Sequence, residues 1–338
     1  MYPKLHNAAW PGLVGKGGPG ADPIIDLDTM LKITAETKVD GQGFDGIDLF
    51  AGLPHIDTHD DKAVDALVQK IKDLQLNVGT LVAPIWSGCA FGTQPERDEF
   101  LKQLTAACEF GQKLREAGVR PYGGVRIDTA GGVERWATAP EENTALIIQT
   151  FDQACDIAQS YGEYLAAEGE ICWGGMHSWK YMLDVLESVN RPDVLGYQAD
   201  LAHTSLFMLG ANAPEHRIVA DDFDWNDKAA QNAAWKTIAD ALRPWTVDFH
   251  VAQNDGTVKG SGSHDKTGKH CLADDPNGKL DVVEVAGFWL TEDGQPTCAL
   301  KHLCWDGCMF PNEVMLQPKT WETILSVMLK IRAQYAWK

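Results

Sequence analysis

Long apolar runs and basic residues are what this 338-residue sequence most clearly lacks. No stretch of about 20 apolar residues occurs, so we expect no membrane-spanning helix. Lys and Arg number 29 against 48 Asp and Glu, which gives a formal net charge of −19. Because nucleic acids and anionic membranes are bound through basic surfaces, this charge argues against both as partners. We therefore expect a protein whose partner is a small molecule.

Signals for secretion, for nucleotide phosphates and for a thiolate zinc site are also missing. The opening residues, MYPKLHNAAWPG, lack the basic-then-apolar pattern of a signal peptide. The Gly-rich segment Gly12–Gly20 does not end in Gly-Lys-Ser/Thr, so it predicts a loop and not a phosphate cradle. Cys304 and Cys308 have no second cysteine pair to complete a zinc site. The 8 cysteines are scattered, which in a large chain without a signal peptide indicates reduced thiols and a cytoplasmic protein.

Strand-like and helix-like segments alternate along the whole chain. This alternation predicts a parallel sheet, and eight units in 338 residues fit a closed (β/α)₈ TIM barrel of the α/β class better than an open sheet. No composition break marks a linker, so residues 1–338 are predicted to form a single domain with a long loop after the seventh strand. The predicted strands are Leu5–Trp10, Gly43–Phe50, Asn77–Trp86, Val119–Asp128, Glu163–Ile171, Val194–Asp200, Trp245–Asn254 and Leu300–Phe310. The predicted helices are Asp28–Thr37, Asp61–Leu74, Glu96–Ala117, Glu141–Tyr161, His177–Val189, Asp227–Leu242, Leu280–Leu290 and Thr320–Tyr335.

Carboxylates and imidazoles gather where the last four predicted strands end. In a barrel these ends meet on one face, which is where the chemistry of such barrels lies. Buried carboxylates are costly without compensation, and one dication supplies it. A ligand set rich in oxygen with one nitrogen favours Mn²⁺, with Mg²⁺ or Co²⁺ as alternatives. The residues concerned are Glu168 and Glu170, then Asp200 and His203, then Asp248, His250 and Asn254, then His302, Cys304, Asp306 and Cys308.

Four motifs resemble those of the xylose-isomerase-like TIM barrels, which include sugar isomerases and ketose 3-epimerases. These are GFDGID at Gly43–Asp48, AEGE at Ala167–Glu170, DLAH at Asp200–His203 and DFHVAQ at Asp248–Gln253. The resemblance implies that Asp200 and His250 bind metal and that His203 lies near the substrate. Two positions depart from the family pattern: Asp48 and Asp306 stand where the family usually has Glu.

The loop after the seventh strand is longer than in the simple epimerases and carries His264 and His270. It looks similar to the loop of family barrels that act on 3-oxo-glycosides, including the metal-dependent subunit of C-glycoside deglycosidases. This likeness implies that both histidines fold over the pocket. Because barrels of this family commonly pair, it also leaves open a homo-oligomer or a small partner subunit.

Taken together, these patterns assign roles to particular residues. We predict Glu168, Asp200, His250 and Asp306 as metal ligands, with Glu168 preferred over Glu170 because it directly follows the apolar run Leu165–Ala167. The predicted catalytic residues are Glu168, Asp306 and His264, with Glu168 as the base and His203, His264 or His270 as rivals. The predicted substrate contacts are His203, Glu170, Arg126, Asn254, His270 and Trp305, with Trp86 and Trp173 as further wall residues.

Such a site suits enolisation of a ketosugar or 3-oxo-glycoside, in which a base removes the proton next to a carbonyl whose oxygen is held by the dication. Returning the proton gives isomerisation or epimerisation. If a leaving group lies β to the carbonyl, elimination follows instead, which would make the protein a carbon–carbon lyase acting on 3-oxo-C-glycosides. A metal-dependent endonuclease and a non-catalytic sugar-binding barrel are the remaining alternatives, and the net charge argues against the first.

Overall fold

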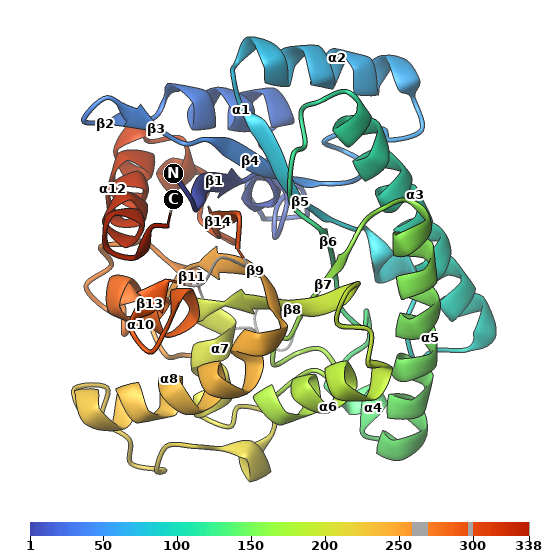
Figure 1. Ribbon diagram of the computed structural model, residues 1–338, viewed down its shortest axis with the longest axis vertical. Coiled ribbons are helices and arrows are strands. Elements are labelled where there is room, and N and C mark those ends of the chain that lie inside the picture. Colours follow the sequence, from blue (N-terminus) through green and yellow to red (C-terminus); the bar gives the residue numbers. More distant parts are fainter. Residues whose placement is uncertain (259–269, 297–299, 338) are drawn as a thin grey trace.

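Eight parallel strands close into a barrel in the computed structural model, which describes residues 1–258, 270–296 and 300–337. Around the ring the strands follow the order β1-β14-β9-β8-β7-β6-β5-β4. Figure 1 shows the strands at the centre with the helices outside them. The predicted (β/α)₈ barrel is thus confirmed. Its strands are β1 (Lys4–Ala8), β4 (Gly46–Phe50), β5 (Asn77–Val82), β6 (Val125–Ile127), β7 (Leu165–Glu168), β8 (Leu195–Asp200), β9 (Thr246–Val251) and β14 (His302–Trp305).

The main helices lie close to their predicted positions, because capping residues and apolar stripes define them locally. In α2, the Asp60 side chain accepts the N–H of Lys62, and Val64, Leu67 and Ile71 form the buried stripe. The helices that match predictions are α1 (Leu27–Glu36), α2 (Asp61–Asp73), α3 (Gln94–Glu116), α5 (Pro140–Ser160), α6 (Trp179–Val189), α8 (Lys228–Leu242), α10 (Val282–Leu290) and α12 (Pro318–Tyr335).

One buried helix was not predicted. α7 (Leu201–Met208) begins directly at the end of β8, and all its residues are buried. A helix buried on every side has no polar face, so the periodicity that identifies surface helices is absent. Its N-cap is Asp200, whose side chain accepts the N–H of His203. The same residue therefore ends a strand and begins a helix.

All eight strands are shorter than predicted, and in two of them a local feature explains the difference. β6 begins only at Val125, because the preceding Gly123 has a positive φ of 92° and packs its backbone against Gly79. β14 ends at Trp305, after which the Asp306 side chain accepts the N–H of Cys308 and turns the chain. Asp306 therefore lies just beyond its strand, at the rim of the barrel.

Smaller elements complete the described chain. Three two-stranded sheets pair β2 (Lys38–Val39) with β3 (Gln42–Gly43), β10 (Gln253–Asn254) with β11 (His270–Cys271), and β12 (Thr291–Glu292) with β13 (Gln295–Pro296). Two short helices are α4 (Val133–Trp136) and α11 (Asn312–Met315). The chain ends meet, since Tyr2 and Trp337 exchange two backbone hydrogen bonds (Figure 1). Across the described ranges, no helix combines the length and apolarity needed to span a bilayer.

The apolar core and the polar interior occupy different places. The main hydrophobic cluster joins strands to the helix layer, and its fully buried tryptophans are Trp235, Trp289, Trp305 and Trp321. Polar side chains from β1, β4 and β14 instead meet one another, as His6, Asp48 and His302. Charged groups thus continue from the rim into the body of the barrel.

Candidate metal centre

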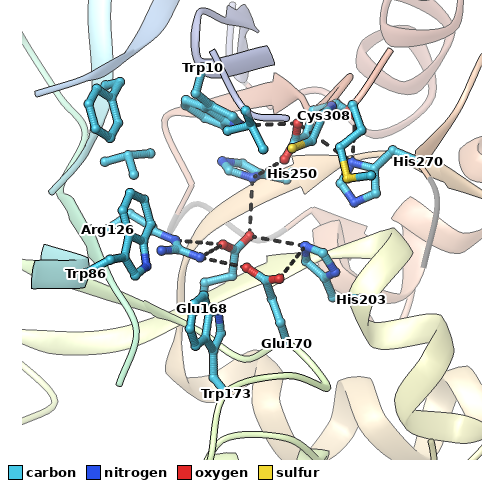
Figure 2. A pocket seen from close by; sticks show the side chains of 15 residues that line it. Trp10, Trp86, Arg126, Glu168, Glu170, Trp173, His203, His250, His270 and Cys308 are labelled. Atoms are coloured by element: carbon cyan, nitrogen blue, oxygen red, sulfur yellow. Dashed lines mark hydrogen bonds and ion pairs between the residues drawn. The ribbon is translucent and has the colours of Figure 1, made fainter. Parts of the chain in front are cut away.

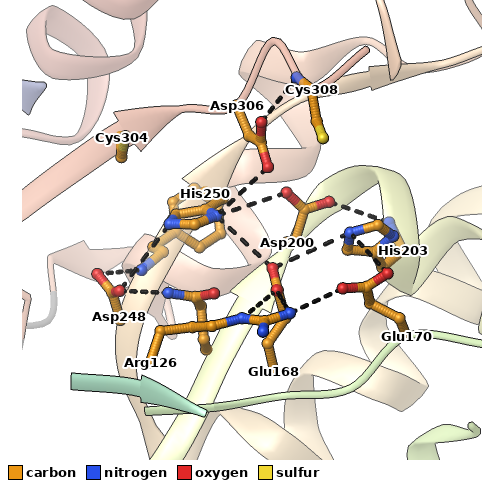
Figure 3. A network of polar contacts seen from close by, with 12 residues as sticks. Arg126, Glu168, Glu170, Asp200, His203, Asp248, His250, Cys304, Asp306 and Cys308 are labelled. Carbon is orange, nitrogen blue, oxygen red and sulfur yellow. Dashed lines mark hydrogen bonds and ion pairs between the residues drawn. The ribbon is translucent and has the colours of Figure 1, made fainter. Parts of the chain in front are cut away.

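Four neighbouring strands deliver the four predicted ligands to one place. Glu168 and Asp200 are the last residues of β7 and β8, His250 lies one residue before the end of β9, and Asp306 follows β14. His250 Nδ1 lies 3.7 Å from Glu168 Oε1, 3.8 Å from Asp200 Oδ2 and 3.9 Å from Asp306 Oδ2. Figure 3 shows the three carboxylates converging on this ring. Donor atoms that each lie about 2.1 Å from one ion are about 3 to 4 Å apart. Glu168, Asp200 and His250 offer donor atoms within 4.8 Å of one another, so these three suit a shared cation, and Asp306 faces the same His250 nitrogen.

The hydrogen bonding of these atoms also fits a cation. Buried polar atoms in proteins are nearly always hydrogen-bonded. Here a whole group of buried atoms has no hydrogen-bond partner within the described residues. They are Glu168 Oε1, Asp200 Oδ2, both ring nitrogens of His250, His203 Nδ1 and His270 Nε2. Three carboxylates and imidazole nitrogen form a donor set suited to a hard or borderline divalent ion.

Arg126, from β6, organises the carboxylates on the other side of the site. Its Nε donates to Glu168 Oε2 at 2.7 Å, its Nη2 donates to Glu170 Oε1 at 2.8 Å, and its Nη1 donates to Asp128. The three carboxylates outweigh the effect of burial and raise the pKa of Arg126. Burial raises the pKa of Asp128 despite this contact. Arg126 thus fixes one oxygen of Glu168 and leaves the other facing His250.

Asp306 is held in the same one-sided way. Its Oδ1 accepts the indole N–H of Trp10 at 3.2 Å and the backbone N–H of Cys308 at 2.8 Å. Burial would raise the pKa of Asp306, but His270 and His250 outweigh it, so the pKa lies below its usual value. Trp10 also stacks on the His250 ring with centroids 5.2 Å apart. Only Oδ2 of Asp306 therefore remains for an ion.

Two further histidines stand beside the ligand group. His203 Nε2 lies 3.8 Å from Glu170 Oε2 and 4.0 Å from Glu168 Oε1. His270 lies with its ring centroid 4.9 Å from that of His203, and its Nε2 is 3.9 Å from Asp200 Oδ1. Burial would lower the pKa of His270, but the carboxylates of Asp306 and Asp200 raise it to about 10. These carboxylates therefore attract positive charge strongly.

A cavity opens above these groups (Figure 2). Its polar floor contains Arg126, Glu168, Glu170, His203, His250, His270 and Asp306. Its walls are mainly apolar, with Trp86 40% exposed. Such a cavity fits an organic ligand whose polar atoms face the floor. The wall residues are Trp10, Val14, Phe50, Val82, Trp86, Trp173, Cys308 and Met309.

Two predicted substrate contacts do not line this cavity. Trp305 is wholly buried in the hydrophobic cluster, because it alternates with Cys304 along β14 and points to the opposite side of the strand. Asn254 is also wholly buried, and its Oδ1 accepts the N–H of Gly256 within the turn after β10. His264 lies outside the described residues. The predicted wall residues Trp86 and Trp173 do line the cavity.

Trp10 and Met309 line the cavity but were not predicted site residues. Trp10 lies two residues beyond the end of β1, so its position at the carboxyl end of a barrel strand was an available signal. Met309 lies beyond β14 in a positive-φ conformation, at 69°, which no simple sequence pattern identifies.

A chain of polar contacts continues beneath His250. Its Nε2 lies 4.0 Å from Asp248 Oδ2, and Asp248 Oδ1 lies 3.6 Å from His302 Nε2. His302 Nε2 contacts Asp48 Oδ2 at 3.1 Å, and the other Asp48 oxygen contacts His6 Nδ1 at 2.7 Å. Asp248 Oδ2 accepts a hydrogen bond from Gln198 and makes none with His250, so Asp248 contributes negative charge behind the His250 ring.

Room for this polar chain comes from Gly79. A side-chain carbon at Gly79 would lie 2.2 Å from Asp48 Oδ1 and 2.7 Å from His302 Nε2. Burial would raise the pKa of Asp48, but His302 and His6 have the larger effect, so the pKa of Asp48 lies below its usual value. Burial would lower the pKa of His302, but Asp48 raises it. The 3.1 Å contact between Asp48 and His302 therefore favours the charged form of each side chain.

Comparison with known proteins supports the fold. The family model described as xylose isomerase-like TIM barrel matches residues 38–273. The structure resembles that of a D-tagatose 3-epimerase-like protein, with a TM-score of 0.62 and 12% identity over 98% of this chain and 100% of the other. It also resembles 3-keto-D-glucoside 4-epimerase from E. coli, with a TM-score of 0.57 and 12% identity over 98% and 100%.

A third similar structure is a xylose isomerase-like TIM barrel protein from Mycobacterium smegmatis in complex with magnesium. Its TM-score is 0.62 and its identity 12%, over 99% of this chain and 98% of the other. At such identities the likeness establishes the fold and does not establish the reaction. Among curated protein sequences the chain has no match.

Proposed function

The chain belongs to the xylose isomerase-like TIM barrel family, and from this premise we propose that it is a divalent-metal-dependent enzyme that enolises a ketosugar or a 3-oxo-glycoside. The observation that carries the proposal is the convergence of three carboxylate oxygens on His250 Nδ1 at 3.7 to 3.9 Å. Glu168, Asp200, His250 and Asp306 would hold the ion, with Mn²⁺ preferred and Mg²⁺ or Co²⁺ as alternatives. The family member crystallised with magnesium supports a hard divalent ion.

When bound, the dication would stabilise negative charge on substrate oxygen atoms. The surrounding side chains would orient the substrate and move the proton. Glu168, the predicted base, has its Oε2 engaged by Arg126 and its Oε1 turned toward the ligand group. Asp306 is similarly restricted, since Trp10 and Cys308 occupy its Oδ1. Both are therefore better suited to binding metal than to accepting a proton.

We assign proton transfer to His203 instead. It lines the cavity, and its Nε2 lies between the carboxylates of Glu170 and Glu168, at 3.8 and 4.0 Å. Glu170 is itself anchored by Arg126, so its carboxylate has a fixed position beside the imidazole. His203 also lies in the first turn of α7, where its backbone N–H donates to the N-cap Asp200, so the residue has a defined position.

The substrate is expected to be unphosphorylated. Among the cavity-lining residues that the structure describes, the cationic side chain Arg126 already pairs with three carboxylates. A phosphate would therefore meet an acidic floor. Isomerisation or epimerisation is the outcome that we favour. Elimination from a 3-oxo-C-glycoside is the second candidate, favoured by the apolar wall of Trp10, Trp86 and Trp173, which suits an aromatic leaving group.

Metal content is the first test of the proposal. The protein as purified and after incubation with Mn²⁺ is compared with the double variant Glu168→Ala, His250→Ala. The control double variant Glu36→Ala, His59→Ala removes the same residue types from exposed positions. We expect about one ion per chain in the parent and control, and none in the site variant. A parent that binds no ion contradicts the mechanism.

Enolisation is then measured directly. The metal-loaded protein is incubated in D₂O with free ketosugars and with 3-oxo-glycosides, and deuterium incorporation next to the carbonyl is followed by NMR. Exchange that depends on the metal and is lost in His203→Ala supports the assignment. If metal-dependent exchange persists in His203→Ala, His203 is not the base and Glu168 is the candidate instead.

A further inference from the structure

We propose that His270 is a fifth ligand of the metal ion. This inference rests on the proposed function, because it concerns the ion that Glu168, Asp200, His250 and Asp306 would hold. The sequence places His270 among the substrate contacts. The geometry of its two ring nitrogens points to the other role.

The fold holds His270 firmly beside the ligand group. It lies in β11, which pairs antiparallel with β10, and Asn254 is its partner in the register. β10 follows almost directly on β9, the strand that carries His250. The hairpin is anchored below by Gln253, whose side chain both donates to and accepts from the backbone of Leu280, at 2.8 and 2.9 Å. His270 itself is only 2% exposed and lines the cavity.

A backbone carbonyl sets the tautomer of His270. Its Nδ1 lies 3.3 Å from the carbonyl oxygen of Asp306. A carbonyl oxygen can only accept, so Nδ1 must carry the proton in this contact. The neutral ring then presents a lone pair on Nε2. Histidines that bind metals commonly donate their other ring N–H to a backbone carbonyl in this way.

The free nitrogen faces the ligand group. His270 Nε2 is buried, has no hydrogen-bond partner in the described chain, and lies 3.9 Å from Asp200 Oδ1. This separation is too long for a hydrogen bond and equals the spacing around His250 Nδ1. Asp200 directs Oδ2 to His250 and Oδ1 to His270, so the two imidazoles flank one carboxylate.

His270 also compensates for a weak donor. Asp306 stands where the resemblance predicts the longer Glu, and its Oδ1 is occupied by Trp10 and Cys308. Asp306 can therefore offer one oxygen only. The His270 imidazole, which is hydrogen-bonded to the Asp306 carbonyl oxygen, supplies a further donor atom from the same side of the site.

His203 is the matched comparison. Its ring lies next to that of His270 and is equally buried, but its Nδ1 has no partner in the described chain to fix a tautomer. Its Nε2 faces Glu170 more closely than any predicted metal ligand. We therefore assign His203 to the substrate and His270 to the ion.

Counting the imidazole nitrogens bound to the ion tests this directly. Pulsed electron paramagnetic resonance of the Mn²⁺-loaded protein detects each coordinated ¹⁴N, without any substrate. We expect two in wild type and in His203→Ala, and one in His270→Ala and in His250→Ala. The Mn²⁺ dissociation constant, measured by chelator competition, should rise at least about 10-fold in His270→Ala, the lower end of losses seen even for outer residues around metal sites.

The outcomes separate the two proposals. One nitrogen in wild type, or a second nitrogen lost in His203→Ala, overturns the role of His270 and leaves the metal centre standing. Two nitrogens retained in a folded His270→Ala variant overturn it as well. If His270→Ala does not fold, two nitrogens in both wild type and His203→Ala support the proposal. Of the two imidazoles grouped with Asp200 in the described site, His203 and His270, only His270 remains in His203→Ala. No ion in the wild type overturns the proposed function itself.

Discussion

At the scale of single residues, Arg126 decides the charge balance of the site. It contacts three buried carboxylates, and two of them, Glu168 at the end of β7 and Glu170 just beyond it, lie on the cavity floor. Arg120 forms a comparable buried pair with Glu163, at 2.8 Å, but does not line the cavity. The two arginines therefore offer a matched pair, one beside the candidate metal centre and one away from it.

Replacing Arg126 with Met should destabilise the protein by about 3 to 5 kcal/mol, because it leaves buried carboxylates without a cation. Arg120→Met should cost less, because Arg115 still contacts Glu163 at 2.6 Å. The response to Mn²⁺ should differ. Removing a positive charge next to Glu168 makes the site more negative, so added Mn²⁺ should stabilise Arg126→Met by more than it stabilises wild type. Added Mn²⁺ should stabilise Arg120→Met by no more than it stabilises wild type. Urea unfolding with and without Mn²⁺ measures both increments, and equal increments in the two variants would contradict this account.

At the scale of elements, the junction between β8 and α7 combines structure with chemistry. Asp200 Oδ1 caps α7 by accepting the N–H of His203, while Oδ2 faces His250. A cap needs only an accepting oxygen, whereas a metal ligand here also needs negative charge. The two tasks can therefore be separated by substitution.

Asp200→Asn should keep the cap and lose the ion. We expect its free energy of unfolding without metal to exceed that of Asp200→Ala by about 1 kcal/mol, because Asn caps helices as well as Asp does. Both variants should bind Mn²⁺ at least about 10-fold more weakly than wild type. The control Asp60→Ala removes the N-cap of α2, so it should lose about 1 kcal/mol and bind Mn²⁺ normally. Normal Mn²⁺ binding by Asp200→Asn would exclude Asp200 as a ligand.

The start of α3 gives a pH-dependent contribution to stability. Arg135 and the backbone and side chain of Thr93 donate to Glu96, and these hydrogen bonds lower its pKa to about 2. A lowered folded-state pKa stabilises the fold above the ordinary value of 4.5, and this contribution disappears as the pH falls toward 2. The free energy of unfolding of wild type should thus exceed that of Glu96→Gln by about 1 kcal/mol at pH 7, and this difference should shrink below pH 4.5.

Thermal melts from pH 7 to pH 3 measure this difference. The control Asp65→Asn removes an exposed carboxylate from α2 and should melt as wild type does at each pH. A difference between wild type and Glu96→Gln that stays constant with pH would show that the capping interaction does not depend on ionised Glu96.

At the scale of the whole molecule, the net charge of −19 must be separated from the specific site. A highly charged protein is stabilised by any salt that screens repulsion, whereas a ligand of the folded state stabilises by mass action. At a free Mn²⁺ concentration about 100 times Kd, the gain should be about 2.7 kcal/mol. The melting temperature of protein treated with EDTA should therefore rise more with Mn²⁺ than with NaCl at equal ionic strength.

The double variant Glu168→Ala, His250→Ala supplies the control for that measurement. It retains most of the surface charge, so it should show only the shift that NaCl produces. If wild type and the variant respond alike to Mn²⁺, the stabilisation is general screening and gives no support to a metal centre.

The sequence alone determined the barrel and the grouping of its carboxyl-end residues. Strand and helix patterns are local, and parallel strands in a closed barrel must end on one face. The positions of Glu168, Asp200, His250 and Asp306 therefore follow once the strands are recognised. Their roles as ligands remain a prediction that metal binding will decide.

The tertiary structure decided what surrounds those four residues. Trp10 reaches Asp306 across 296 positions of sequence, and the β10–β11 hairpin brings His270 against Asp200. The same structure turns Trp305 into the core and makes α7 a buried helix. No local pattern specifies such contacts, because they depend on which side of a strand each residue occupies and on the pairing of β11 with β10. Strand ends can be read from the sequence, whereas the side chains that complete the site are set by packing between distant segments.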